Sequence, residues 1–345
     1  MNAFSPLAGI SVRAASAADH ARIAGFAAGR LFHRPEWSRA VERGCGQRSH
    51  YLLAEAPDGA LAGILPLTEM RSRLFGSALV STGFGVDGGI LADRAEAVEA
   101  LADAAWALAQ SRGCASVELR GGPLPQGWQR QDGTYAGFVR DLPQGEEAIL
   151  KSIPRKQRAE VRRALGNGFD VGAGSGPAER EAHYRVYSES VRNLGTPVFP
   201  RALFDAMLDS FGDDADILIV RKDGCPVSSV LSFYSGGTVY PYWGGGTHAA
   251  RAGRANELLY FELMRHASER GCARFDFGRS KLGTGAHAYK KNWGFEPRPL
   301  VYAVKGEARE TNPLSPRYRL QVALWKKLPL AVANLLGPHI AKGLG

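Results

Sequence analysis

The chain has 345 residues, 45% of them hydrophobic and 22% charged. At roughly 100–200 residues per domain this length predicts two domains, and the composition argues against long disordered segments. Lysine and arginine outnumber aspartate and glutamate by 43 to 34, giving a net charge of +9. This excess suits a polyanionic partner such as a phosphate-bearing donor, a nucleotide sugar, tRNA or an anionic membrane, and it equally fits a solvated basic surface.

The four cysteines, Cys45, Cys114, Cys225 and Cys272, form no CxxC pair, and no histidine cluster has the spacing of metal ligands. We therefore expect no disulfide framework and no metal site, and a reducing compartment fits best. Residues 1–18 lack the apolar core of a signal peptide, and no stretch reaches the about 20 apolar residues that span a bilayer. The sequence predicts a cytoplasmic protein.

The first half of the chain predicts three strands, a helix and a further strand. Asp58-Gly59 stands between two apolar runs, which is a strong hairpin signal. Gly113 stands where a helix takes a left-handed C-terminal cap. The elements in chain order are strands over 51–54, 61–67 and 78–82, a glycine-rich loop over 83–89, a helix around 98–108 and a strand over 117–119.

Residues 143–168 join the two halves. Their segment 151–163 is strongly basic and predicts a helix after Pro154. No aromatic residues are interleaved with the charges, so a solvated face is favoured over a nucleic-acid patch. The glycine-rich stretch 172–177 predicts a loop.

The second half predicts the same order of elements as the first. Asp223-Gly224 again gives a turn, and Gly271 again stands at a helix end. The elements are strands over 217–220, 227–234 and 238–243, a glycine-rich loop over 244–246, a helix around 258–267 and a buried strand over 275–277.

The two halves also share a short sequence. Residues 111–119 and 269–277 both contain Arg-Gly-Cys-Ala, between a helix and a strand. We interpret this as an internal duplication. Antiparallel strands followed by a helix and a strand are the order of an acetyltransferase-like (GNAT-like) fold, because a doubly wound sheet would alternate strands and helices from the start. The predicted fold class is therefore α/β (α+β), with two tandem GNAT-like domains and mixed, mostly antiparallel central sheets, over 1–150 and 151–310, followed by a tail over 311–345.

The strongest candidate site runs from 275 to 295. A buried strand ends at Phe277, and a polar, glycine-punctuated loop and an aromatic–basic cluster follow it. Four basic side chains could meet a phosphate or a developing oxyanion, namely Arg279, Lys281, Lys290 and Lys291. The alternative is a solvated basic loop over a small aromatic core of Tyr289, Trp293 and Phe295. His287 is a weak acid–base candidate.

The second candidate site is the segment 240–246, Tyr-Pro-Tyr-Trp-Gly-Gly-Gly, which contains Tyr242 and Trp243. A proline inside a strand removes a ladder donor, so Pro241 predicts an edge, a bulge or a separation of strands. Arg251 and Arg254 precede the next helix, whose free N–H groups could form an anion site with them. The alternative is an ordinary helix start capped by Asn256.

The tail contains an apolar run, 324–336, beside two lysines. It could lie on a membrane surface with Trp325 at the interface, as a peripheral contact at the inner membrane. The alternative is that it packs on the body of the protein, which we slightly favour.

Phe275-Asp276-Phe277-Gly278, with residues 289–295, Tyr-Lys-Lys-Asn-Trp-Gly-Phe, resembles the C-terminal signature of the FemAB family. More narrowly, residues 276–281 and Thr284-Gly285 look like the FemAB-related proteins associated with exosortase (PEP-CTERM) and exopolysaccharide loci. The resemblance implies tandem acetyltransferase-like folds and amide-forming transfer, which in that family moves an aminoacyl group from tRNA to a peptidoglycan precursor. The family's lysine near the reaction centre falls on Lys290, and Tyr289 replaces the aromatic residue before it.

We therefore expect an acyltransferase or aminoacyltransferase acting on a cell-envelope acceptor, either a peptidoglycan precursor or an exopolysaccharide-related one. The donor would be acyl-CoA or aminoacyl-tRNA, with no tightly bound cofactor. Lys290 would stabilise the oxyanion and Asp276 would accept the amine proton, while Arg279, Lys281, Tyr242, Trp243, Arg251, Arg254 and Tyr289 would bind substrate. The first domain would shape the cleft and bind the acceptor. A non-catalytic adaptor of an exopolysaccharide or exosortase assembly and a membrane-surface RNA binder are the alternatives.

Overall fold

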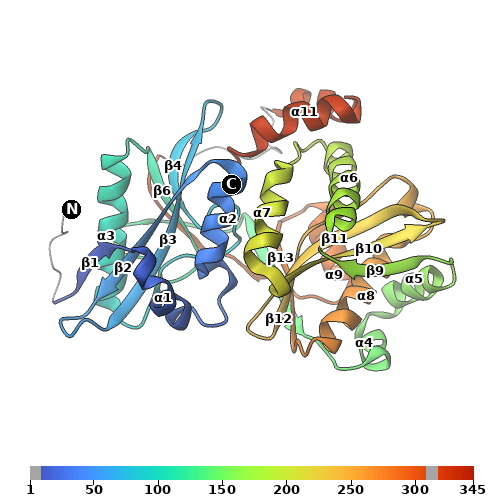
Figure 1. The fold of residues 1–345 in the computed structure, drawn as a ribbon, viewed down its shortest axis with the longest axis horizontal. Coiled ribbons are helices and arrows are strands. Elements are labelled where there is room, and N and C mark those ends of the chain that lie inside the picture. The colour runs from blue at the N-terminus through green and yellow to red at the C-terminus, as the bar shows by residue number, and fades with distance from the viewer. Residues whose placement is uncertain (1–8, 308–317) are drawn as a thin grey trace. The chain divides into compact units, whose positions relative to one another are not determined.

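The computed structural model describes residues 9–307 and 318–345. They fall into two compact units, each built on its own sheet (Figure 1). The first unit takes residues 9–133, 300–307 and 339–345, and the second takes 134–299 and 318–338. These limits differ from the predicted boundaries at 150 and 310, because one strand from each half of the chain belongs to the sheet of the other half.

The first sheet has the strand order β1-β2-β3-β4-β6-β15-β7, with β5 paired to β3. All its pairs are antiparallel except β4 with β6. The strands are β1 Ser11–Ala14, β2 Arg48–Glu55, β3 Leu61–Ser72, β4 Gly76–Ser81, β5 Leu91–Ala92, β6 Ser116–Arg120, β7 Gln129–Gln131 and β15 Tyr302–Gly306.

The second sheet has the strand order β14-β8-β13-β12-β11-β10-β9. Here only β12 and β13 run parallel. The strands are β8 Tyr135–Asp141, β9 Asp170–Gly174, β10 Ala215–Lys222, β11 Cys225–Ser235, β12 Thr238–Gly246, β13 Arg274–Lys281 and β14 Arg298–Pro299. The mixed α/β fold class predicted from the sequence is confirmed.

The predicted duplication is visible in both sheets. Three antiparallel strands (β2-β3-β4; β10-β11-β12) lead into a helix and then into a strand parallel to the third one. The shared Arg-Gly-Cys-Ala ends each helix in the same way, since the cysteine N–H donates 2.9 Å to the carbonyl oxygen five residues earlier, Cys114 to Ala109 and Cys272 to Ala267. Gly113 and Gly271 take the left-handed conformation, with φ of +65° and +77°. The repeated sequence is thus a helix cap.

The two halves exchange one strand each. β8 follows the first copy but pairs antiparallel with β13 in the second sheet. β15 follows the second copy but pairs antiparallel with β6 in the first sheet. Each exchanged strand therefore occupies the equivalent place beside the strand that follows the helix.

The first sheet buries both faces. Leu52 and Leu65 lie in one core with α3 (Ala95–Ser111), whereas Leu53 and Ile64 lie in another with α1 (His20–Phe26). This division follows from the period of two along a strand. The second helix is α2 Pro35–Cys45, which packs on β2 and β3.

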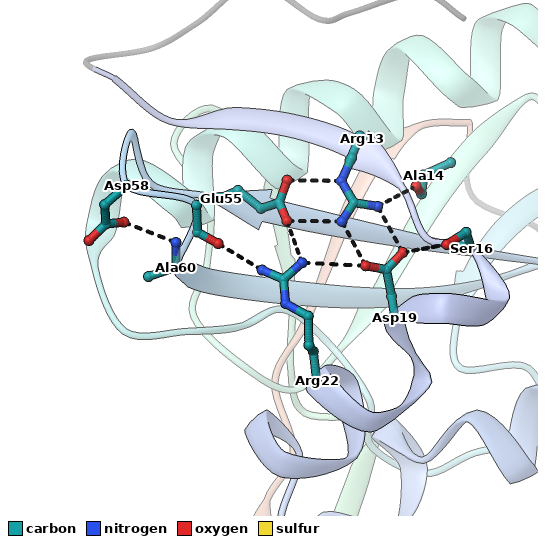
Figure 2. Close-up of polar contacts among 9 residues, drawn as sticks. Arg13, Ala14, Ser16, Asp19, Arg22, Glu55, Asp58 and Ala60 are labelled. Carbon is teal, nitrogen blue, oxygen red and sulfur yellow. Dashed lines mark hydrogen bonds and ion pairs between the residues drawn. The ribbon is translucent and has the colours of Figure 1, made fainter.

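A charged network ties β1 and β2 to α1. Arg13 on β1 donates to Asp19 and to Glu55 at the end of β2, and Arg22 on α1 also donates to Glu55 (Figure 2). The Arg13 guanidinium holds the pKa of the Asp19 carboxyl well below its usual range. The network is a structural clasp within the first unit.

The second sheet lies between two groups of helices. α8 packs on β10, β11 and β12, and α5 packs against α8. α6 packs on β10, β11 and β12, and α7 packs on β10 (Figure 1). The helices are α4 Glu146–Ser152, α5 Arg155–Leu165, α6 Pro177–Leu194, α7 Arg201–Phe211, α8 Ala255–Glu269 and α9 Gly285–Asn292. The predicted basic helix after Pro154 is confirmed, but its segment is no free linker, because Val161 and Ala164 are buried in the core of the second unit.

Two predicted loops are wrong. Gly244–Gly246 belong to β12, where they pair with residues 228–230 of β11, and residues 172–174 belong to β9, which pairs with β10. Glycine runs indicate loops only when no neighbouring strand supplies hydrogen-bond partners, and here both runs have such a neighbour.

The C-terminal segment forms two short helices, α10 Arg319–Trp325 and α11 Leu330–Ala341. In residues 9–307 and 318–345, no helix combines the length and the apolar character that crossing a bilayer requires. The predicted packing of the tail is correct in part. Val322 contacts Gly195, and Asn334 donates to Ser188 of α6.

Candidate functional site

The parallel strands β12 and β13 separate soon after they begin. They pair only at Thr238 with Arg274 and at Val239 with Phe275. The next residues of β12 carry a bulge, since its register against β11 shifts around Tyr242. Pro241 explains the separation, because it has no N–H to donate to a neighbouring strand. The disruption predicted from this proline is confirmed.

A pocket of about 250 Å³ lies at the far end of β12. It is formed by residues of α6, β12, the segment before α8, α8 itself and α9, all within the second unit. Its lining includes Ser190, Asn193, Gly245, Arg251, Asn256, Tyr260 and Tyr289. The pocket therefore brings together Arg251 and Tyr289, two of the residues predicted to bind substrate.

Two tyrosines give this pocket its polar wall. The Tyr289 hydroxyl is buried and has no hydrogen-bond partner among the described residues. Burial raises its pKa well above the usual value, and burial raises the pKa of Tyr260 to about 12. Both side chains therefore stay protonated at neutral pH, and the Tyr289 hydroxyl is a buried donor whose proton has no acceptor among the described residues.

Gly245 and Gly246 of β12 lie so close to neighbouring side chains that no larger residue fits there. A Cβ on Gly245 would lie 2.3 Å from the Ser190 hydroxyl oxygen, and one on Gly246 would lie 2.4 Å from the Asn256 side-chain oxygen. That oxygen accepts a hydrogen bond of 2.5 Å from Ser228. Asn256 thus anchors the start of α8 to the sheet and does not cap the helix, as the alternative prediction for this segment had it.

The two arginines before α8 have different surroundings. Arg254 has a positive φ of 61° at the helix start, and its guanidinium pairs with Glu160 at 2.7 Å. Arg251 lines the pocket and has no carboxylate partner among the described residues. Among the described residues of the pocket lining, only Arg251 therefore presents an uncompensated charge, and the lining also includes Asn256 at the start of α8. This combination fits a phosphate-bearing group.

Lys290, Asp276 and Arg279 form a second cluster. The Lys290 ammonium donates 2.9 Å to the Arg279 carbonyl oxygen and lies over the rings of Phe138 and Phe277. Burial lowers the pKa of Lys290 to about 8, against the opposing effect of the Asp276 carboxylate and with the added effect of the Arg279 charge. None of the three residues is in the lining of the pocket.

Lys290 and Tyr289 are adjacent on α9, so their side chains leave the helix about 100° apart. This explains why Tyr289 lines the pocket while Lys290 turns to β13. The Asp276 side chain accepts from the Gly278 N–H at 2.8 Å, and the Arg279 guanidinium lies over the Tyr135 ring. Lys281 is half-buried at the end of β13.

The two aromatic residues predicted to bind substrate lie elsewhere. Trp243 is only 4% exposed and packs edge-on against Phe204 and Phe233 in an aromatic core. Tyr242 is half-buried and contacts Trp243. Trp243 therefore has little surface left for a ligand, and neither residue is in the pocket lining.

Sequence reasoning missed most of the pocket. Ser190 and Asn193 come from α6, whose sequence contains no recognisable motif. Tyr260 lies among the apolar residues of α8, so nothing in the sequence distinguishes it from a core residue. The one available signal was the glycine run of β12, because three glycines within a strand indicate close approach to another group.

The first unit has a pocket of its own, of about 260 Å³. His50 lines it and donates its Nε2 proton, at 3.0 Å, to Glu69, a buried carboxylate that Arg71 and Arg112 also contact. These hydrogen bonds lower the pKa of Glu69 to about 2 against the opposing effect of its burial. Ser38 in the same lining has a buried hydroxyl without a partner among the described residues.

Residues 155–291 match a protein-family model described as the acetyltransferase (GNAT) domain. The match runs from α5 to α9, so the region similar to this family lies within the second unit and has the GNAT-like fold. Among curated proteins, none is significantly similar in sequence to this chain.

Several solved structures share the fold of the chain over most of its length. FemX is 15% identical with a TM-score of 0.64, and the match covers 84% of this chain and 96% of that one. The C-terminal domain of a candidate lysylphosphatidylglycerol synthetase from Agrobacterium fabrum is 13% identical with a TM-score of 0.56, covering 84% and 93%. A tandem GNAT protein from the clavulanic acid biosynthesis pathway is 13% identical with a TM-score of 0.54, covering 86% and 98%. The tandem GNAT-like architecture predicted from the sequence is confirmed.

Proposed function

We propose that this chain is an N-acyltransferase that moves an acyl or aminoacyl group from an activated donor to an amine of a cell-envelope acceptor. The observation that carries the proposal is the pocket of the second unit. It lies on the strand that parts from β13, and it combines an uncompensated arginine, the start of α8 and a buried, unpartnered tyrosine hydroxyl. These are the parts needed to hold a phosphate-bearing donor and to donate to its reacting end.

The donor would be acyl-CoA or aminoacyl-tRNA. Both carry phosphates for Arg251 and the start of α8, and both present a carbonyl activated as a thioester or an ester. The match of residues 155–291 to an acetyltransferase domain supports acyl-CoA as the first donor to test. FemX and the lysylphosphatidylglycerol synthetase domain support the aminoacyl alternative through their fold alone.

The reaction would form one bond and break another at the same carbon. The acceptor nitrogen attacks the carbonyl carbon, a tetrahedral oxyanion forms, and the C–S or C–O bond to the donor breaks as the amide appears. The proton lost by the amine goes to a base, for which Asp276 is our candidate. The leaving group takes a proton, for which Tyr289, a residue of the pocket lining, is our candidate.

Lys290, which is next to Tyr289 on α9 but outside the pocket lining, is our candidate for the charge that stabilises the oxyanion. A well-placed donor contributes about 3 kcal/mol in such sites. To act there its ammonium must exchange the Arg279 carbonyl for the oxyanion, and its depressed pKa of about 8 still leaves it mostly charged at neutral pH.

A cell-envelope acceptor is the finer part of the proposal. It rests on the resemblance of residues 275–295 to the FemAB signature and on a structural neighbour named for making a lysyl derivative of the lipid phosphatidylglycerol. The assignment to the exosortase-associated branch rests on residues 276–281 and Thr284-Gly285, and it is part of the proposal.

Two matched arginine variants test donor binding. Acetyl-CoA is titrated by calorimetry into the wild type, Arg251→Ala and Arg254→Ala. We expect Arg251→Ala to weaken binding about tenfold, because one charge-assisted contact is lost. Arg254→Ala should change affinity less than about twofold, because its charge already pairs with Glu160. Uncharged tRNA is titrated in parallel.

If neither acetyl-CoA nor tRNA binds, or if both variants behave like the wild type, the proposal is wrong. A second assay separates catalysis from binding. Lys290→Ala and Tyr289→Phe are compared with the wild type for release of free coenzyme A in the presence of a primary amine. Folded variants that bind donor but have lost turnover support catalysis, and turnover equal to wild type in both contradicts the assigned roles.

A further inference from the structure

The two C-terminal helices carry leucines that face solvent. On α10, Leu320 and Leu324 are 70% and 58% exposed, and on α11, Leu335 and Leu336 are 69% and 45% exposed. Residues four apart on a helix lie on the same face, so Leu320 and Leu324 form one apolar strip. Val332, exposed at 39%, extends the outer face of α11 one turn toward its start.

The inner faces of these helices are fixed by packing. Val322 of α10 contacts Gly195 at the end of α6. Asn334 of α11 donates to Ser188 of α6 at 3.3 Å, and Ala333 is buried. The exposed leucines are therefore held outward by contacts made on the other side of each helix. Large side chains kept in water in this way indicate a partner surface.

The charge of the segment identifies the kind of partner. Residues 311–345 contain no aspartate and no glutamate. Arg319, Lys326 and Lys327 are exposed, and none of them has a carboxylate partner within 318–345 or the other described residues. Leucines with flanking lysines and no acidic residue are the composition of helices that lie on anionic bilayers.

We propose that α10 and α11 dock the protein on the surface of an anionic lipid bilayer. The leucines enter the boundary between headgroups and acyl chains, and Arg319, Lys326 and Lys327 meet the lipid phosphates. The helices have 7 and 12 residues, too few to span a bilayer, so the contact is peripheral. This inference does not depend on the proposed acyl transfer, because the docking surface is separate from the pocket lining.

Vesicle co-sedimentation of the full chain tests the inference. One set of vesicles is phosphatidylcholine alone, and in the other a third of the lipid is phosphatidylglycerol. We expect binding to the anionic vesicles only, weakened by added salt. Leu335→Ser/Leu336→Ser and Lys326→Glu/Lys327→Glu should each lower the partition coefficient by about tenfold or more, because each removes two contributing side chains.

Two matched controls change exposed residues that lie outside α10 and α11. Leu74→Ser/Leu165→Ser changes leucines of similar exposure, 67% and 44%, and Arg155→Glu/Lys156→Glu makes the same change of charge on exposed residues of α5. Both controls should bind within about twofold of the wild type, because a docking surface is local whereas net charge is global.

Absence of binding to anionic vesicles overturns the inference, as does an equal loss of binding in the controls. A second measurement covers the case of a protein partner. If Leu335→Ser/Leu336→Ser turns an oligomer into a monomer in sedimentation velocity while vesicle binding is unchanged, the leucines cover a second copy of the chain and the lipid assignment is wrong.

Discussion

The parallel strand pairs of the two sheets differ in how far they stay together. In the first sheet, β4 and β6 pair at four successive positions, from Ala78 with Ser116 to Ser81 with Leu119. In the second sheet, β12 and β13 pair at two positions and then part. The same chain order therefore gives one closed sheet and one open sheet.

Aligning the copies on Arg-Gly-Cys-Ala shows what closes the first sheet. Glu118 corresponds to Asp276, and Arg120 corresponds to Gly278. Arg120 is buried and donates to Glu118 at 2.7 Å and to the Gly85 carbonyl oxygen at 2.9 Å. It thus fastens the loop after β4 onto the end of β6. Gly278 has no side chain to do this. With a φ of +69° it lies in an irregularity of β13, where the register against β8 shifts between Asp276 and Arg279.

The difference indicates which features the two copies of the duplicated fold share and which features have diverged. The helix cap is kept in both copies because both helices need an end. The groups at the strand ends diverge, since they serve the closed loop in one copy and a pocket in the other. The proposed donor site therefore lies in the second unit, and the first unit has a pocket of its own beside His50.

Removing the Arg120 side chain should break the closed sheet. Arg120→Ala removes the donor to the Gly85 carbonyl and one donor to the Glu118 carboxylate, so we expect the free energy of unfolding of the first unit to fall by about 3 kcal/mol. Urea unfolding followed by circular dichroism measures this. The control is Arg130→Ala on β7, an exposed arginine paired with Asp132, which should cost less than about 1 kcal/mol. Equal effects of the two variants would contradict the role given to Arg120.

The buried lysine of the open sheet should show in the pH dependence of stability. The folded pKa of Lys290 is about 8, below the 10.5 of a free lysine, so the unfolded chain binds more protons between these values. The free energy of unfolding of the wild type relative to Lys290→Met should rise by about 1–3 kcal/mol from pH 8 to pH 10.5. Unfolding at a series of pH values tests this, and a flat difference across that window would mean that Lys290 is solvated.

Glycine replacements give the smallest expected effects. Gly278→Ala should destabilise the second unit by about 1 kcal/mol, because alanine is strained at the φ of +69° although no atom obstructs its Cβ. The matched variant is Gly285→Ala at the start of α9, where φ is not positive and the Cβ also meets nothing within 4 Å. It should be neutral or stabilising by up to about 1 kcal/mol. If Gly278→Ala stabilised the second unit, the left-handed conformation described for Gly278 would be refuted.

The order of the secondary-structure elements could be predicted from the sequence, because the signals that set it are local. The Asp-Gly turns, the helix caps and Pro241 each act on their own neighbours, so the order of elements and the parting of β12 could be predicted. The exchange of β8 and β15 could not, since strand pairing between distant segments leaves no local pattern. The Lys290 cluster was predicted from polar density and from the FemAB resemblance. Its separation from the pocket lining depends on the turn of α9, which places Tyr289 in the lining instead.

Hydrogen exchange measured with and without the donor tests most directly whether the donor binds to the second unit alone. The exchange of backbone amides is followed by mass spectrometry in the presence of acetyl-CoA and, separately, of uncharged tRNA. We predict slower exchange for peptides covering 244–260 and 285–292 with one of the two, and no change for peptides covering 78–95 and 116–120. Protection of the first unit at these equivalent positions, or none at the pocket of the second with either donor, would contradict the account.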